Sequence, residues 1–247
     1  MKKIVFIAML CNLLFVACKK ENETTTHQVP ARKIENGRLT IFQYDNQNRL
    51  IREIFVWGAE DRDTIEYVYN PDGTPKKILR LGKLDGDVEF IYSGNHTILK
   101  ISSRWNWAQD LMAYDTAKFM LNPNGEIVNM EAWGVLASFT YNSNGNITAV
   151  DYGSERADML YSDVPSIWRH VNVPNWFFAV VWGDFWVSKT GYMLRKKTKS
   201  WDCVDSDNEV VEYIYEGNDY VSRVTRRTAS FGNTKTEIML FEYVLAK

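Results

Sequence analysis

The chain has 247 residues, of which 45% are hydrophobic and 24% charged, the ordinary balance of a globular protein with a sizeable core. Its formal charge is −2 at pH 7, so no basic surface indicates nucleic-acid binding. Aromatic residues make up 14% of the chain, which favours β-sheets. Of the three cysteines, only Cys203 is expected to remain a free thiol in the mature protein, and it is interpreted as a small buried hydrophobe rather than a nucleophile.

The first residues predict an export signal. A basic start, Met1 to Lys3, precedes the apolar run from Ile4 to Ala17, whose 14 residues are too few to span a membrane and are typical of a signal peptide. We therefore predict a signal peptide over residues 1–17, followed by Cys18 and a flexible polar tether up to residue 36.

The segment Leu14-Phe15-Val16-Ala17-Cys18 resembles a bacterial lipobox. The resemblance implies cleavage before Cys18 and a diacylglycerol on its thiol, which would anchor the protein to a membrane. The alternative is a plain secretory signal with a chance cysteine. Lys19, directly after the cysteine, resembles the pattern of lipoproteins sent to the outer membrane. Lys20-Glu21 with Glu23 resembles the surface-export signals of Bacteroidota lipoproteins. This implies an outer-membrane lipoprotein, either surface-exposed or facing the periplasm.

One strand–turn–strand unit recurs along residues 37–247. In its clearest copy, apolar residues alternate from Ile65 to Tyr69, Asn-Pro-Asp-Gly turns the chain, and a second strand leaves through Ile78. The alternation is typical of a strand with one buried face, and the turn residues predict a type I turn followed by a left-handed glycine. Taking the last residue before the turn as an anchor, six copies align, at Tyr44, Tyr69, Tyr92, Leu121, Tyr141 and Tyr215.

The aligned copies share further positions. An aromatic residue stands two before every anchor, and the residue nine after it is apolar except at Glu53. Four after the anchor stand residues of types that mostly tolerate positive φ, namely Asn48, Gly73, His96, Gly125, Gly145 and Asp219. We predict hairpins over 37–57, 63–82, 87–104, 115–133, 135–152 and 209–227. A further copy begins at Met159 but lacks its turn, and single strands are expected near 192–198 and 236–244.

These hairpins predict an all-β fold. We expect a single antiparallel meander of roughly 13–15 strands over 37–247, curling toward a barrel because closure removes exposed strand edges.

An aromatic insertion at about 163–190 interrupts the repeats and is expected to be partly helical. The window 168–201, which includes most of this insertion, holds five of the nine tryptophans: Trp168, Trp176, Trp182, Trp186 and Trp201. One interpretation has these rings packing the core, and the other has some lining a groove that stacks sugars or lipid tails. We predict that Trp176 and Trp182 are buried, and we take Trp168, Trp186 and Trp201 as candidate binding residues, at least one of them exposed.

The Tyr-Asn-x-x-Gly-x-Ile units resemble a degenerate form of the YD-repeat hairpins of bacterial surface proteins. With the lipobox and the aromatic insertion, they resemble a family of Bacteroidota lipoproteins of unknown function described as having a porin-like fold. The resemblance covers residues 37–247 and implies no catalytic residues. A membrane pore is not expected, because the face opposite the aromatic one carries charged residues: Arg52, Glu66, Glu89, Lys100, Lys118 and Arg223.

Motifs for catalysis or cofactors are missing from the sequence. His27, His96 and His170 are isolated along the chain, and no nucleophile, metalloprotease or phosphate-loop motif occurs. The acidic segment from Asp202 to Glu209 offers alternating oxygen ligands for calcium but lacks the glycine of a calcium loop, so an acidic hairpin end is preferred.

We therefore expect no enzyme, no cofactor and no metal. The expected function is a noncatalytic binding module for a glycan, a peptide or an envelope partner. The alternative is a structural or assembly lipoprotein of the outer membrane with a protein partner.

Overall fold

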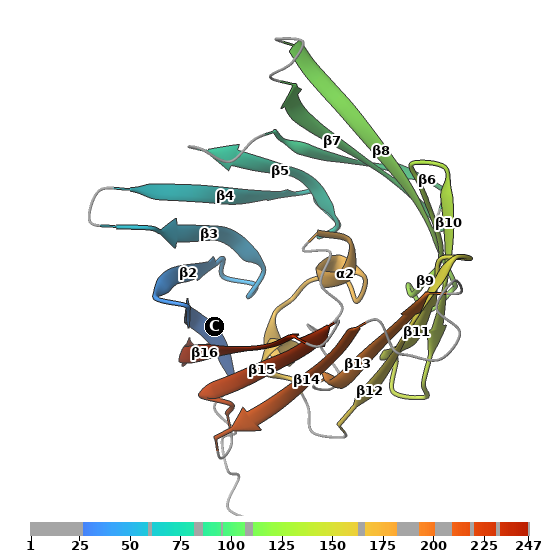
Figure 1. Ribbon diagram of the computed structural model, residues 1–247. Helices are drawn as coiled ribbons and strands as arrows, with labels where there is room; N and C mark the ends of the chain where they lie inside the picture. The colour runs from blue at the N-terminus through green and yellow to red at the C-terminus, as the bar shows by residue number, and fades with distance from the viewer. Residues whose placement is uncertain are drawn as a thin grey trace, which may run out of the picture.

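The computed structural model describes residues 27–58, 61–81, 86–94, 96–106, 111–162, 166–181, 193–200, 209–217, 220–230 and 233–246. Within these residues, sixteen strands are arranged around a central space that holds a short helix, α2 (Phe177–Val181) (Figure 1). The strands are β1 (Gln28–Glu35), β2 (Arg38–Tyr44), β3 (Leu50–Val56), β4 (Arg62–Tyr69), β5 (Pro75–Leu81), β6 (Val88–Ser93), β7 (Thr97–Asn106), β8 (Leu111–Leu121), β9 (Ile127–Ala132), β10 (Val135–Tyr141), β11 (Ile147–Asp151), β12 (Glu155–Tyr161), β13 (Met193–Ser200), β14 (Glu209–Glu216), β15 (Arg223–Ser230) and β16 (Asn233–Leu245).

The sheet is an antiparallel meander that closes on itself. Each strand pairs with the next in sequence, and β1 pairs with β16 from Gln28–Leu245 to Glu35–Met239. The predicted all-β meander that curls into a barrel is therefore confirmed. Among the described residues, no helix is long and apolar enough to cross a membrane.

The closing strand β1 corrects the sequence prediction. Residues 28–35 were expected to belong to the tether, but they form the strand that completes the barrel. With this strand the described sheet has 16 strands, one more than the upper limit of the predicted 13–15. The segment shows no apolar alternation because Lys33 and Glu35, which face the lumen, are polar. Its partner β16 lies at the far end of the sequence, so no local pattern reveals the pairing.

The repeat turns have the predicted backbone. Gly73, Gly125 and Gly145 have φ of 85°, 76° and 76°, and Asn48 has φ of 59° in the equivalent place. Asn or Asp often follows the anchor, and the contacts of its side chain explain this preference. The side-chain oxygen of Asn122, for example, accepts hydrogen bonds from the backbone N–H groups of Asn124 and Glu126, at 2.9 and 3.0 Å. Such Asx contacts fix the turn before the second strand begins.

The third hairpin departs from the repeat. The left-handed residue is Gly94, with φ of 62°, and not His96 as predicted, and the pairing of β6 with β7 has no bulge. Loss of the bulge shifts the second strand by one residue, which moves every side chain to the other face. Lys100, expected on the outer face, consequently pairs with Phe90 and faces the lumen, the place that Ile78 and Val150 take in their hairpins.

The lumen-facing aromatic residues form the core. The residue two before each anchor is buried in all six copies, namely Phe42, Tyr67, Phe90, Phe119, Phe139 and Tyr213. Between β12 and β13 the chain enters the lumen as a 3-10 helix, η1 (Ile167–His170), followed by α2. The described part of this insertion, residues 166–181, is called the plug below, and it confirms that the insertion is partly helical.

A ladder of tyrosines connects neighbouring repeat units. The hydroxyl groups of Tyr69 and Tyr92 donate to the carbonyl groups of Leu50 and Pro75, both at 2.6 Å, and each acceptor lies six residues after the preceding anchor. The same contact joins Tyr44 to Pro30, Tyr215 to Met193 and Tyr243 to Val221. Tyr243 is thus a further anchor, on the last strand, that the sequence alignment missed.

Candidate ligand-binding site in the lumen

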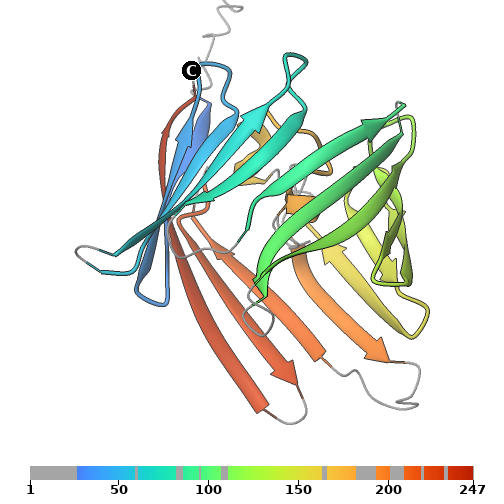
Figure 2. The same ribbon diagram turned by 90° about the horizontal axis from the view of Figure 1, so that it is seen from above.

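The two ends of the lumen differ. The repeat turns, the N-terminal side of β1 and the end of β16 share one end, and the plug lies there, with the backbone N–H of Asn172 bonded to the carbonyl of Asn48 at 2.9 Å. We call this the plugged end (Figure 2). The opposite end carries the turns between β1 and β2, between β3 and β4, and between β15 and β16.

The plug is held by aromatic contacts with the barrel wall. Trp168 makes an edge-on contact with Phe42 at a centroid distance of 5.3 Å, and Phe177 packs on Tyr67 at 5.5 Å. Trp176 contacts Phe90 at 5.9 Å. Because these partners come from β2, β4 and β6, the plug fills the lumen beside the first half of the barrel.

These contacts decide the tryptophan predictions. Trp176 is 5% exposed, which confirms its predicted burial. Trp168 is only 2% exposed, so it is not available as a surface-binding ring and is corrected to a core residue. It is buried because η1 points its ring between Phe42 and Phe178. Trp182, Trp186 and Trp201 lie outside the described residues.

Lys100, on strand β7 of the barrel wall, forms a hydrogen bond with the plug. Its ammonium group donates to the carbonyl of Val180, near the C-terminal end of α2, at 2.7 Å. Burial, with a smaller contribution from the Arg80 guanidinium, lowers the pKa of Lys100 to about 8. A carbonyl at a helix C-terminus is a favourable acceptor for a cation, which explains why a partly buried lysine is tolerated here.

Glu53, the exception in the repeat pattern, is also a lumen residue. It is 5% exposed and accepts a hydrogen bond from the Tyr67 hydroxyl. The break in the apolar pattern therefore marks a buried polar contact rather than a strand facing solvent. Burial, and then the charge of Glu53, raise the pKa of Tyr44 well above its ordinary value.

A cavity of about 300 Å³ lies at the end opposite the plug, and we call it the open-end cavity. Its lining comes from strands at both ends of the sequence: Lys33, Glu35, Asn36, Arg38, Leu39, Thr40, Phe55, Val56, Trp57, Arg226 and Glu237. Strand alternation explains the charged members, because Arg38 shares a face with the buried Thr40 and Phe42. The cavity exists only because β1 closes the barrel between β2 and β16.

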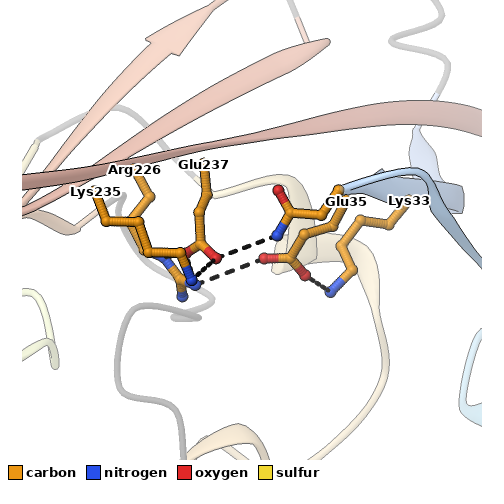
Figure 3. A network of polar contacts seen from close by, with 6 residues as sticks. Lys33, Glu35, Arg226, Lys235 and Glu237 are labelled. Carbon is orange, nitrogen blue, oxygen red and sulfur yellow. Dashed lines mark hydrogen bonds and ion pairs between the residues drawn. The ribbon is translucent and has the colours of Figure 1, made fainter.

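A network of charges forms one wall of this cavity (Figure 3). Glu237 accepts from Arg226 Nε at 2.7 Å, from Lys235 Nζ at 2.7 Å and from Asn36 Nδ2 at 3.1 Å. The hydrogen bond from Lys235, followed by those from Arg226, lowers the pKa of Glu237 to about 2. Glu35 is paired in turn with Lys33 at 3.0 Å and with Arg226 at 3.8 Å.

An aromatic edge also lines this cavity. Trp57 is 43% exposed, lies 6.5 Å from Phe55 in a stacked arrangement, and donates through Nε1 to Asp63 at 2.8 Å. The guanidinium of Arg38 lies over the Trp57 ring, 4.6 Å from its centroid. Sequence reasoning missed this site, since Trp57 stands outside the tryptophan-rich insertion. Its signal was an aromatic residue at the end of a strand whose alternation places it toward the lumen.

Two histidines that are distant in sequence meet at the plugged end. The rings of His27 and His170 are 4.2 Å apart, and Arg169 Nε donates to His170 Nε2 at 2.8 Å. Burial, then Arg169 and His27, lower the pKa of His170. The described residues hold no group of three or more histidine, cysteine, aspartate or glutamate side chains placed to bind a metal ion. Within the acidic segment 202–209, only Glu209 is described, at the start of β14.

These features define a class, a closed antiparallel barrel of repeated hairpins, plugged at one end and with a polar and aromatic cavity at the other. No protein-family model and no curated protein matches the chain. A crystal structure of a porin-like protein from Bacteroides uniformis is similar to it, with a TM-score of 0.40, 10% identity, and coverage of 90% of this chain and 98% of that one. The TcdB2-TccC3-TEV structure is similar with a TM-score of 0.29, 10% identity, and coverage of 84% of this chain and 12% of that one. Membership of the Bacteroidota lipoprotein family stays a prediction.

Proposed function

We propose that the protein is a noncatalytic binding module of the bacterial envelope that holds a saccharide in the open-end cavity. The observation that carries this proposal is the exposed Trp57 edge and a set of hydrogen-bonding groups that line one cavity of about 300 Å³. Sugars present apolar ring faces and a rim of hydroxyl groups, and a ring such as Trp57 stacks on the first while charged and amide side chains bind the second. Ligand pockets often form in the mouths of barrels and begin at about 300 Å³.

The position of the cavity fits an anchored protein. His27, the first described residue, lies at the plugged end, where its carbonyl accepts from the backbone N–H of Ala246 at 2.8 Å. If Cys18 carries the lipid, the eight intervening residues span about 30 Å at most, because His27 is nine residue steps from Cys18. The membrane would then face the plugged end, and the open-end cavity would point away from it. This arrangement supports an outer-membrane lipoprotein that meets its ligand in solution.

Closure of the barrel disfavours one kind of protein partner. Each described strand has hydrogen-bonded neighbours on both sides, although β5 and β6 pair over only two residue pairs, so few backbone groups are left for a partner strand. A protein partner would instead need a side-chain surface.

One observation favours the alternative, an assembly lipoprotein. On the outer face, Ile34 of β1 pairs with Leu240 of β16, and Ile238 lies in one row with Ile214 of β14. These four side chains are 37–43% exposed and form an apolar patch across the closing seam. Such patches mark protein interfaces when they are large enough.

A binding experiment separates the two functions. The mature chain would be applied to a glycan array, and each retained glycan would be titrated into the wild type, Trp57→Ala and Trp133→Ala. Trp133 is 78% exposed, in the turn between β9 and β10, and does not line the cavity, so it is the matched control. Trp57→Ala should weaken binding by about 1–3 kcal/mol, the value of a stacked aromatic ring, with Trp133→Ala unchanged.

Two results would reject the saccharide function. In one, both variants bind as the wild type does. In the other, no glycan is retained while a pull-down from the native envelope recovers a protein partner that Ile238→Ser releases.

A further inference from the structure

The cationic and anionic residues that line the open-end cavity are not equal in number. Three cationic and two anionic residues line it, Lys33, Arg38 and Arg226 against Glu35 and Glu237, which leaves a net charge of +1. Both carboxylates are already neutralised within the protein, Glu237 by Arg226 and Lys235, and Glu35 by Lys33 and Arg226. Arg38 is the cation of this lining that pairs with neither carboxylate.

Arg38 stacks on an aromatic ring. Among the described residues its guanidinium makes no hydrogen bond or ion pair, and it lies over the face of Trp57, 4.6 Å from the ring centroid. Stacking uses the π-face of a guanidinium and leaves its five N–H donors, which lie in the plane, available. The contact also restricts the side chain, so less entropy is lost when a ligand binds to those donors.

We infer that the ligand is an acidic saccharide whose carboxylate is bound by Arg38 while its ring packs at the Trp57 edge. This inference rests on the proposed function and adds the class of sugar. A guanidinium presents two parallel N–H groups with the spacing of a carboxylate, and the pair forms two charge-assisted hydrogen bonds.

The single unpaired guanidinium of this lining favours a carboxylate over a phosphate. A carboxylate brings one negative charge, which the one positive charge of Arg38 balances. A phosphate monoester brings about −1.5 to −2 at neutral pH, more than Arg38 balances. A neutral sugar brings no charge to Arg38.

The test compares one saccharide in two charge states. Methyl galacturonoside, which has a single carboxylate, and its methyl ester share their ring and hydroxyl groups, but the ester carries no charge. Both would be titrated calorimetrically into the wild type, Arg38→Gln, Trp57→Ala and the control Arg32→Gln, at low and at physiological salt. Arg32 pairs with Glu242, both side chains being more than half exposed and outside the cavity lining.

We expect the wild type and Arg32→Gln to bind the acid at least tenfold tighter than the ester, with the difference shrinking as salt rises. Arg38→Gln should bind both forms equally, at the affinity of the wild type for the ester, and Trp57→Ala should weaken both. Equal wild-type affinity for acid and ester, or a preference that survives in Arg38→Gln, overturns the acidic-sugar inference and leaves saccharide binding standing. Binding of neither form also overturns it, and the array with neutral glycans then decides the proposed function separately.

Discussion

The hydroxyl of Tyr69 donates a hydrogen bond to the carbonyl of Leu50 at 2.6 Å, and so connects two consecutive repeat units at the plugged end. Leu50 begins β3 and Tyr69 ends β4, so the bond fixes the start of one hairpin to the turn of the next. Burial raises the pKa of Tyr69 well above its ordinary value, which keeps the hydroxyl protonated and donating across the neutral range. The repeat of this contact around the barrel explains why the anchor is tyrosine in five of its six aligned copies.

Removing one hydroxyl of this ladder should destabilise the barrel. Tyr69→Phe leaves the Leu50 carbonyl without this donor and should lower the free energy of unfolding by about 0.5–1.5 kcal/mol, measured by urea titration. Tyr114→Phe is the control, because Tyr114 is 67% exposed. If the two variants lose the same stability, the ladder does not contribute.

The turn glycines should be sensitive to backbone conformation alone. A Cβ added at Gly73 would meet nothing within 4 Å, so the cost of Gly73→Val comes from φ of 85° and should be about 1–3 kcal/mol in chemical denaturation. At Gly58 the space is also open but φ does not lie in the left-handed region, so Gly58→Val should cost clearly less. Similar costs at both positions would contradict the importance of the left-handed turn.

Glu237 should contribute to stability only above acidic pH. Its pKa is about 2 in the folded protein and ordinarily 4.5, so the unfolded chain binds more protons between these values. The stabilisation is present above about pH 4.5 and is lost as the pH falls toward 2. The free energy of unfolding should therefore fall less steeply in Glu237→Gln than in the wild type over this range.

Breaking the same network from its cationic side should be costly at neutral pH. Arg226→Met removes two donors from Glu237, whose side chain is 8% exposed, and should lower stability by about 1.5–3 kcal/mol. Arg32→Met removes an exposed pair and should cost at most about 1 kcal/mol. Thermal melts of both variants give the comparison, and an equal shift in Tm would refute the role of the network.

Lys100 should make the protein more stable in mild alkali. Its pKa is about 8 when folded and ordinarily 10.5, so between these values the unfolded chain binds more protons and the free energy of unfolding rises with pH. Urea titrations from about pH 7.5 to about pH 9.5 should show this rise in the wild type and in the outward-facing Lys118→Met, but not in Lys100→Met. A rise that persists in Lys100→Met would assign it to other groups.

The lipid anchor is tested at Cys18. Cys18→Ala should abolish metabolic labelling with palmitate and release the protein into the soluble fraction. Cys203→Ala is the control, since it removes the other cysteine expected in the mature chain. Unchanged labelling of Cys18→Ala would favour a plain secretory signal.

The repeats were predictable because their information is local. Alternation toward Tyr69, the Asn-Pro-Asp-Gly turn and the positive φ of Gly73 all lie within one copy, so the hairpins, the meander and the tendency to close follow from adjacent residues. The register predicted for the hairpin at His96 was wrong by one residue, because Gly94 and not His96 takes the left-handed conformation of the turn. The shifted register places Lys100 in the lumen instead of on the outer face.

The site was not predictable, because its residues meet only through closure. Arg38 and Trp57 lie on one hairpin, but Arg226 and Glu237, which line the same cavity, come from strands near the other end of the chain. Trp168 shows the converse, since an aromatic insertion has the same composition whether it fills a lumen or lines a groove. The repeated hairpin follows from the order of the residues, because turns and strand faces are set by residues a few positions apart. Which lumen side chains share a cavity follows only from the folded barrel, because it depends on the pairing of β1 with β16 and on which end the plug fills.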